Sequence, residues 1–284
     1  MSDLAITLVL CMAVAIAYAT AAVLQSRHAD LSVRELLRVP ALWVALALNG
    51  LGAALHVTSL GFGPLSLIQP LGALTLVIAV PLAAATSRRR VTRLEVAGMA
   101  TTVLGLAGLA LVITTAGGSE TLSPPEVVVL IVTTIAVITV LGLRGRRPEA
   151  STLWEAVAGG VAYSVCSALC QTLVVSVGDE GADVLLRPIM ILAVVAVSVF
   201  AVAATLLTQR SYRRGLGAPL ALTNLVNPAS ATVIGVVLLG EHLGTTPVTI
   251  AVAGVCAVLC ALGVTQLARA RDVAVPDPVA AGTR

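Results

Sequence analysis

Amide, hydroxyl and imidazole side chains inside apolar segments are the residues of this chain whose types suit chemistry with a polar ligand. A buried amide costs roughly 1–3 kcal/mol unless it is paired. Two interpretations are open for each: a contact between helices, worth about 0.6 kcal/mol, or the lining of a polar path. The path is favoured for the set, because several members fall in two segments with similar motifs. The set comprises Asn49, His56, Gln69, Thr75, Tyr163, Gln171, Thr223, Asn224 and Asn227.

Two amide–proline pairs are the sharpest motifs within this set. They are Gln69-Pro70 and Asn227-Pro228. A proline inside a helix removes one backbone hydrogen bond and frees a carbonyl one turn earlier. A free carbonyl beside a side-chain amide can coordinate a cation or a polar ligand. The alternative is a kink without a ligand, and the motif alone leaves both open.

Histidine and cysteine supply two further candidates. His56 lies in an apolar segment and would suit a proton-linked role, although a lone histidine is more often simply hydrogen-bonded. Cys166 and Cys170, like Cys256 and Cys260, are four residues apart and therefore share a helix face. A soft-metal site is conceivable at such a pair, but the sequence favours cysteine as a small buried apolar residue.

Acidic and basic residues are missing from the interior of every apolar segment. Enzymes and proton pumps that work inside a bilayer need charged or strongly nucleophilic groups there. The sequence also has no His-x-x-Glu-His spacing and no phosphate-binding glycine loop with a lysine. We therefore expect neither an enzyme nor a nucleotide-driven pump, and no cofactor.

The composition indicates that these segments are surrounded by lipid rather than water. The 284 residues are 58% hydrophobic and 11% charged, against roughly 25% charged residues in a soluble domain. A soluble fold of this length cannot hide so much apolar surface, so the sequence predicts an all-α, polytopic integral membrane protein in a lipid bilayer. The net charge of +3 does not indicate nucleic acid, because the charges sit in short clusters between apolar runs.

Nine apolar segments are long enough to cross a membrane, which takes roughly 20 residues. They are Leu4–Leu24, Ala41–Leu60, Pro64–Ala85, Leu94–Thr115, Pro125–Leu143, Leu153–Val177, Pro188–Leu207, Gly217–Gly240 and Pro247–Leu267. Alternate connections between them carry the arginines, with Arg187 the exception. The positive-inside rule then predicts a cell-membrane protein with its N-terminus outside and its C-terminus in the cytoplasm.

The order of motifs indicates an inverted repeat. An amide–proline pair occurs in the third and eighth segments, a glutamine in the first and sixth, and a glycine in the fourth and ninth (Gly98 and Gly254). Residues 4–115 would form one half, 125–143 a connecting helix and 153–268 the second half. The halves would enter the membrane from opposite sides, as in many secondary transporters. The tail, residues 269–284, is predicted to be disordered and cytoplasmic.

The stretch from Trp43 to Gly118 resembles the first half of the NIPA-type magnesium transporters, within the drug/metabolite transporter superfamily (EamA-like). Pro64 is followed by Pro70-Leu71-Gly72-Ala73-Leu74, which matches the family's pattern of two prolines and Leu-Gly-Ala-Leu. Leu239-Gly240-Glu241 resembles the end of the penultimate helix across the superfamily. The resemblance implies structural or gating roles for Gly72 and Glu241. It also implies a glutamate that Ala53 replaces here, so the expected acidic ligand for Mg²⁺ is missing.

Taken together, the residues and the resemblance predict a secondary transporter for a small solute, working by alternating access. The predicted path residues are Asn49, His56, Gln69, Pro70, Gln171, Asn224, Asn227 and Pro228. A divalent-cation (Mg²⁺) transporter of the NIPA type is one alternative. A membrane sensor or assembly partner without transport activity is another, and a homodimer remains open. The substrate, a small molecule or an ion, is not specified by the sequence.

Overall fold

The computed structural model describes residues 3–59, 71–112, 115–116, 121–145, 151–238, 242–243 and 246–274. Helices dominate, because a helix satisfies its own backbone hydrogen bonds where no water is present. The helices are α1 (Asp3–Ser26), α2 (Val33–Leu36), α3 (Pro40–Ser59), α5 (Leu71–Thr86), α6 (Arg93–Val112), α7 (Pro124–Gly145), α8 (Leu153–Glu180), α9 (Pro188–Ser211), α10 (Gly217–Leu238) and α11 (Pro247–Ala274), with 3₁₀ turns η1 (Ala182–Leu186) and η2 (Tyr212–Arg214). A helix therefore lies at each predicted segment.

Within the described ranges, five helices are long and apolar enough to cross a membrane. They cover residues 8–26, 124–145, 153–180, 188–214 and 247–270, and shorter apolar helices cover residues 40–56 and 74–86. The prediction of an all-helical protein with apolar helices suited to a bilayer is confirmed at this level. That every predicted segment crosses the membrane stays a prediction.

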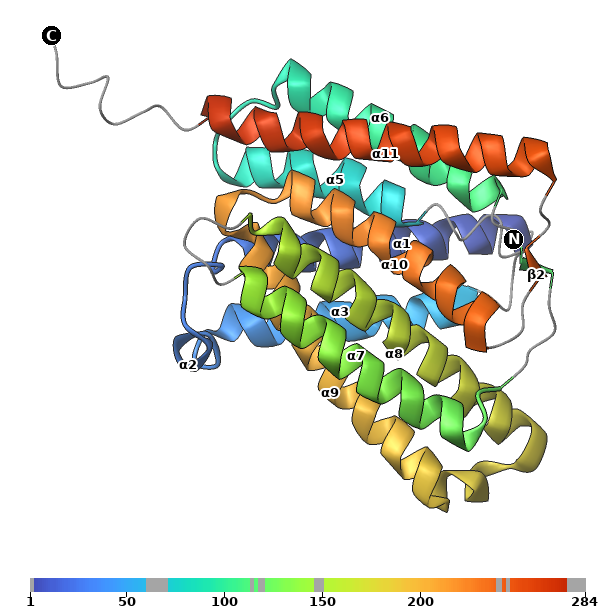
Figure 1. Cartoon of the computed structure of the whole chain (residues 1–284). Coiled ribbons are helices and arrows are strands. Elements are labelled where there is room, and N and C mark those ends of the chain that lie inside the picture. The colour runs from blue at the N-terminus through green and yellow to red at the C-terminus, as the bar shows by residue number, and fades with distance from the viewer. Residues whose placement is uncertain are drawn as a thin grey trace, which may run out of the picture.

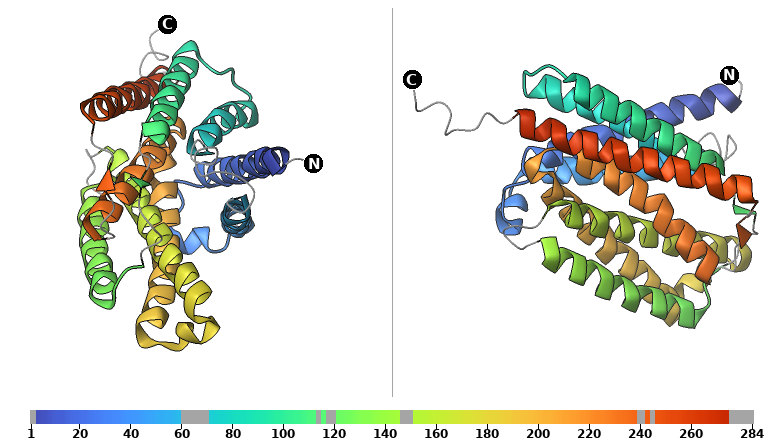
Figure 2. Two further views of the ribbon diagram at one scale, coloured as in Figure 1. Left: turned by 90° about the vertical axis from the view of Figure 1, so that its right-hand side faces the viewer. Right: turned by 45° about the horizontal axis from the view of Figure 1, so that its top comes forward.

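Most of the helices fall into two packed groups (Figure 1). In the first group, α1 packs against both α3 and α5; in the second, α8 packs against both α9 and α10. Helices α6 and α11 lie side by side along one edge of the molecule (Figures 1 and 2). Helix α7 packs against α8.

The two ends of the bundle differ in charge. We call one end the basic end: it carries the connections from α1 to α3, from α5 to α6 and from α9 to α10, and the last turns of α11 (Figure 1). Its arginines include Arg27, Arg89, Arg213 and Arg269. The opposite end, the acidic end, carries the connection from α8 to α9 with Asp179, Glu180 and Asp183. Helix α1 begins at the acidic end, and α11 finishes at the basic end.

The short helix α2 is an element that the sequence analysis did not predict. Ser32 and Glu35 form a capping box: the Ser32 backbone N–H donates to Glu35 Oε2 over 2.9 Å, and the Glu35 N–H donates to Ser32 Oγ over 3.4 Å. The hydrogen bond from the Ser32 hydroxyl holds the pKa of Glu35 below its ordinary value. The Trp43 indole N–H then donates to the Leu37 carbonyl over 3.1 Å, which ties this connection to the start of α3.

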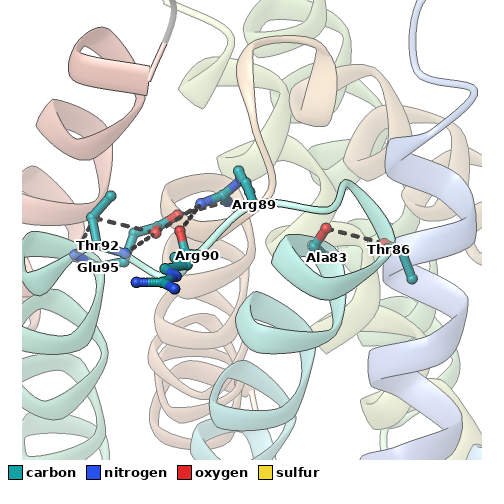
Figure 3. Close-up of polar contacts among 6 residues, drawn as sticks. All are labelled: Ala83, Thr86, Arg89, Arg90, Thr92 and Glu95. Atoms are coloured by element: carbon teal, nitrogen blue, oxygen red, sulfur yellow. Dashed lines mark hydrogen bonds and ion pairs between the residues drawn. The ribbon is translucent and has the colours of Figure 1, made fainter.

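The loop between α5 and α6 is held by a two-pronged ion pair (Figure 3). Arg89 donates to both carboxylate oxygens of Glu95, over 2.9 and 2.7 Å. The Thr92 backbone N–H donates to the same carboxylate over 2.8 Å, and the Glu95 N–H donates to Thr92 Oγ1 over 3.1 Å. Glu95 therefore caps the first turn of α6 and holds Arg89, in the preceding loop, against that helix. The hydrogen bond to Glu95 raises the pKa of Arg89.

Helices α6 and α11 approach closely because glycines on α6 face cysteines on α11. A Cβ added at Gly105 would lie 2.6 Å from Cys260 Sγ and 2.8 Å from the Cys256 carbonyl oxygen. Gly108 faces the sulfur of Cys256 in the same way. Small residues allow such close backbone contact between apolar helices. The contact explains this cysteine pair as packing residues, in agreement with the interpretation that the sequence favoured.

Two boundaries differ from the predictions. The fourth segment was expected to stay helical to Thr115, whereas α6 ends at Val112 and Thr115 pairs with Leu243 in a two-residue antiparallel ladder of β1 (Thr115–Ala116) and β2 (His242–Leu243). Helix α11 runs to Ala274, past Ala268, where the disordered tail was expected to begin. No glycine or proline interrupts this stretch, and Ala270 is buried against the bundle.

Candidate site between the two helix groups

The residues predicted on α3 share one face but do not join a larger polar cluster. Asn49 and His56 are seven residues apart and therefore lie on the same side of the helix. Both are half-buried. Helix α3 packs mainly against α1, and Ala53, which stands where the resembled family has a glutamate, is exposed. This face of α3 supplies an amide and an imidazole without an acidic group.

The residues predicted on α10 lie beside its contact with α8. Thr223 Oγ1 donates to the Ala156 carbonyl over 3.2 Å, which joins the two helices. Asn224 and Asn227 are half-buried on an adjoining face, and α10 continues through the exposed Pro228. The second amide–proline pair is thus inside a helix, as the sequence analysis expected.

The remaining predicted residues divide into three cases. Gln171 is exposed on α8, so the structure does not bring it to the amides of α10. Gly72 is the second residue of α5. Gln69, Pro70 and Glu241 lie outside the described residues.

A cluster of aromatic hydroxyls and threonines that the sequence analysis largely missed lies where the two groups meet. The chain has three tyrosines, and Tyr18 of α1, Tyr163 of α8 and Tyr212 of η2 all come from elements at this junction. The Tyr163 hydroxyl lies 3.3 Å from Thr205 Oγ1 of α9. Tyr212 is 3% exposed, which places a phenol inside the core.

Gly52 on α3 holds the ring of Tyr18. A Cβ added at Gly52 would lie 2.6–3.0 Å from three carbons of that ring. Only a residue without a side chain permits this approach. Tyr18 is therefore fixed against α3 while its helix also faces the second group. The sequence signals for this cluster were the rarity of tyrosine and the place of Tyr163 inside an apolar segment.

Buried amides and hydroxyls continue the cluster towards the basic end. Gln25, Thr208 and Gln209 are each 4% exposed or less. Gln209 Nε2 donates to the His28 carbonyl over 3.1 Å, and Arg213 Nε donates to the Ala29 carbonyl over 3.3 Å. These two bonds tie the end of α9 to the segment that follows α1.

Two amide atoms of the cluster make no hydrogen bond in the part of the chain that the structure describes. They are Gln25 Nε2 and Gln209 Oε1. Buried polar atoms are nearly always paired, and each orphan costs about 1–3 kcal/mol. Such groups suit a ligand that brings its own hydrogen-bonding atoms.

An apolar core closes the bundle beneath these residues at the basic end. It joins both groups, since Ala22 and Val23 of α1 and Leu76 of α5 pack with Leu220 of α10 and Leu267 of α11. Of the remaining clusters, one stays within α1 and α3, another stays within α7 to α10 and the residues next to α7, and a third joins α6 with α10 and α11.

The described residues contain no group of three histidine, cysteine or acidic side chains that could hold a metal ion. The cysteines in these ranges are not joined in disulfides, and Cys166 Sγ lies 3.6 Å from the Val197 carbonyl. The chemistry on offer at the junction is hydrogen bonding by neutral hydroxyls and amides. No protein-family model, curated protein or solved structure matches the chain.

Proposed function

We propose that this chain is a secondary transporter of the drug/metabolite type, which moves a small polar solute by alternating access between two inverted halves. Helices α1 to α6 form one half, α8 to α11 form the other, and α7 connects them. The junction around Tyr163 and Thr208 binds the solute. The acidic end faces outside and the basic end faces the cytoplasm of a cell membrane.

The pattern of helix packing supports two equivalent halves. In each half the first helix packs against the second and the third: α1 against α3 and α5, α8 against α9 and α10. Between the halves, the two fourth helices pack against each other (α6 against α11), and so do the two third helices (α5 against α10). An inverted repeat predicts both relationships, because a pseudo-two-fold axis pairs equivalent helices.

The single observation that carries the proposal is the set of buried, unpaired polar atoms at the junction. Gln25 and Gln209 supply a donor and an acceptor in a place where lipid and water are both displaced by protein. A purely structural membrane protein gains nothing from such groups. Both halves contribute to the apolar core at the basic end, so we expect the solute to enter the junction from the acidic end.

Two measurements on cells that express the chain test this function and separate the alternatives: growth at limiting Mg²⁺ and metabolite content. The chain is expressed in a bacterial host without magnesium uptake systems, with membrane abundance checked by blot. Untargeted profiling then compares metabolites in cells and medium. We expect a change in one class of polar metabolite without rescue at limiting Mg²⁺, because no acidic cluster is present among the described residues.

Two matched variants make this test specific. Thr208→Val removes the buried hydroxyl while keeping the shape, so the metabolite change should disappear at unchanged abundance. Thr134→Val is the control: this buried threonine on α7 donates to the Leu130 carbonyl over 2.6 Å, away from the junction. Rescue at limiting Mg²⁺ would favour the NIPA-type alternative. No effect on either solutes or magnesium would favour a sensor or assembly partner.

A further inference from the structure

A half-open groove of about 380 Å³ lies near the basic end, between α7 and α9 and over the start of α8. Its volume is within the range of roughly 300–1,000 Å³ typical of ligand sites. The walls are mainly aliphatic. The lining residues from α7 and α9 include Ile138, Gly142, Leu143, Leu206 and Leu207.

The side chain of Arg210 brings a positive charge to this groove. Arg210, in the last turn of α9, lines it and is half-buried. Its guanidinium takes part in no hydrogen bond or ion pair with the described residues. Glu155 also lines the groove, but it is only 1% exposed. Among the described residues that line the groove, Arg210 is the one cation, and it is more exposed than the carboxylate of Glu155.

The tryptophans place this groove at the level of lipid headgroups. Both tryptophans of the chain lie in the first turn or so of a helix at the basic end: Trp43 in α3 and Trp154 in α8. They are 57% and 39% exposed, and the guanidinium of Arg144 lies 5.6 Å from the Trp154 ring. Exposed tryptophans mark the membrane–water interface. Val33 of α2, also exposed, forms part of the rim.

We propose that the groove binds one glycerophospholipid of the leaflet at the basic end. One acyl chain lies against Ile138, Leu206 and Leu207, and the phosphate receives hydrogen bonds from Arg210. The planar guanidinium suits a phosphate, which it can hold with two donors. The aliphatic stem of the arginine runs along the apolar wall. This site is separate from the junction between the helix groups, and it does not depend on transport.

Native mass spectrometry of the purified full chain in detergent tests the site. The probes are dioleoyl-phosphatidylglycerol, dioleoyl-phosphatidylethanolamine and dioleoylglycerol, which lacks the phosphate. Both phospholipids should bind with one-to-one stoichiometry, and dioleoylglycerol should bind about tenfold more weakly, since a charge-assisted hydrogen bond to phosphate is lost. Equal binding of dioleoylglycerol would overturn the proposal.

Two variants and one control locate the binding. Arg210→Gln should weaken binding of both phospholipids about tenfold. Arg269→Gln, an exposed arginine at the end of α11, should bind them like the original chain. Gly142→Phe keeps Arg210 and is designed to fill the groove: a Cβ at Gly142 meets Leu207 Cδ2 at an ordinary 3.5 Å, and thermal unfolding checks that the variant folds. Unchanged binding in Arg210→Gln or in a folded Gly142→Phe, or equal loss in Arg269→Gln, would each refute the site.

Discussion

The side-chain amide of Gln209 donates to the backbone carbonyl of His28 over 3.1 Å, and this bond ties the end of α9 to the segment after α1. The two residues are 181 positions apart in the chain. Arg213 makes a second bond of the same kind to Ala29, over 3.3 Å. Together they hold the two helix groups at the end of the candidate site that lies nearest the basic end.

Removing this tie should loosen the basic end. Gln209→Met keeps the volume but removes the donor, and Arg213→Gln shortens the second tie. Arg213→Gln should cost about 1 kcal/mol of stability, the usual net value of one hydrogen bond. Gln209→Met should cost less, because it also removes the unpaired Oε1. Hydrogen exchange should rise in the segment after α1 while α7 keeps its protection. Uniformly faster exchange would point instead to general destabilisation.

The seam between α6 and α11 should tolerate almost no added volume. Gly105→Ala places a methyl group 2.6 Å from Cys260 Sγ and 2.8 Å from the Cys256 carbonyl, so the helices must move apart. We expect a loss of roughly 1–3 kcal/mol, measured by thermal unfolding in detergent. Adding Cys260→Ala should restore part of this loss, because the sulfur leaves but the carbonyl stays.

Gly254 on α11 provides the matched control for that experiment. It has no atom within 4 Å of an added Cβ. Gly254→Ala should therefore leave stability unchanged or raise it by up to about 1 kcal/mol through helix propensity. An equal loss in both variants would mean that the seam is not the source of the effect.

The ion pair in the loop between α5 and α6 should matter more than its counterpart at the acidic end (Figure 3). The side chains of Arg89 and Glu95 are 38% and 11% exposed, against 56% and 46% for Arg187 and Glu180. Glu95→Gln should cost about 1 kcal/mol or more, because it also weakens the cap of α6. Glu180→Gln should have an effect below about 0.5 kcal/mol, as for other exposed pairs.

Labelling of single cysteines checks the orientation of the bundle. Ser87→Cys lies in the exposed loop at the basic end, and Asp183→Cys lies exposed at the acidic end. In intact cells, a membrane-impermeant maleimide should label Asp183→Cys at once and Ser87→Cys only after permeabilisation. The parent chain, whose described cysteines lie within apolar helices, is the background control. The reverse pattern would invert the predicted topology.

The positions of the helices followed from the sequence because each apolar run is a local property. Pro188 and Pro247 begin α9 and α11 where the runs begin. Helix α2 escaped prediction, since a four-residue helix has too little periodicity and rests on one capping box. The amides of α10 were predicted as polar residues of an apolar helix, and the structure places them beside its contact with α8. Gln171 was grouped with them by motif order, but its place on the outer surface of α8 depends on how the helices rotate.

By itself, the sequence determined the all-helical class, the apolar character of the helices and the sorting of charge between the two ends. These properties depend on composition and on order along the chain, since a bilayer selects for length and hydropathy. Only the tertiary structure decided that Tyr18, Tyr163 and Tyr212 belong to one junction and that Gln209 reaches His28. Such contacts join residues far apart in the chain, and they depend on which face of each helix turns inward. In a chain so rich in alanine, valine and leucine, helical periodicity does not reveal that face.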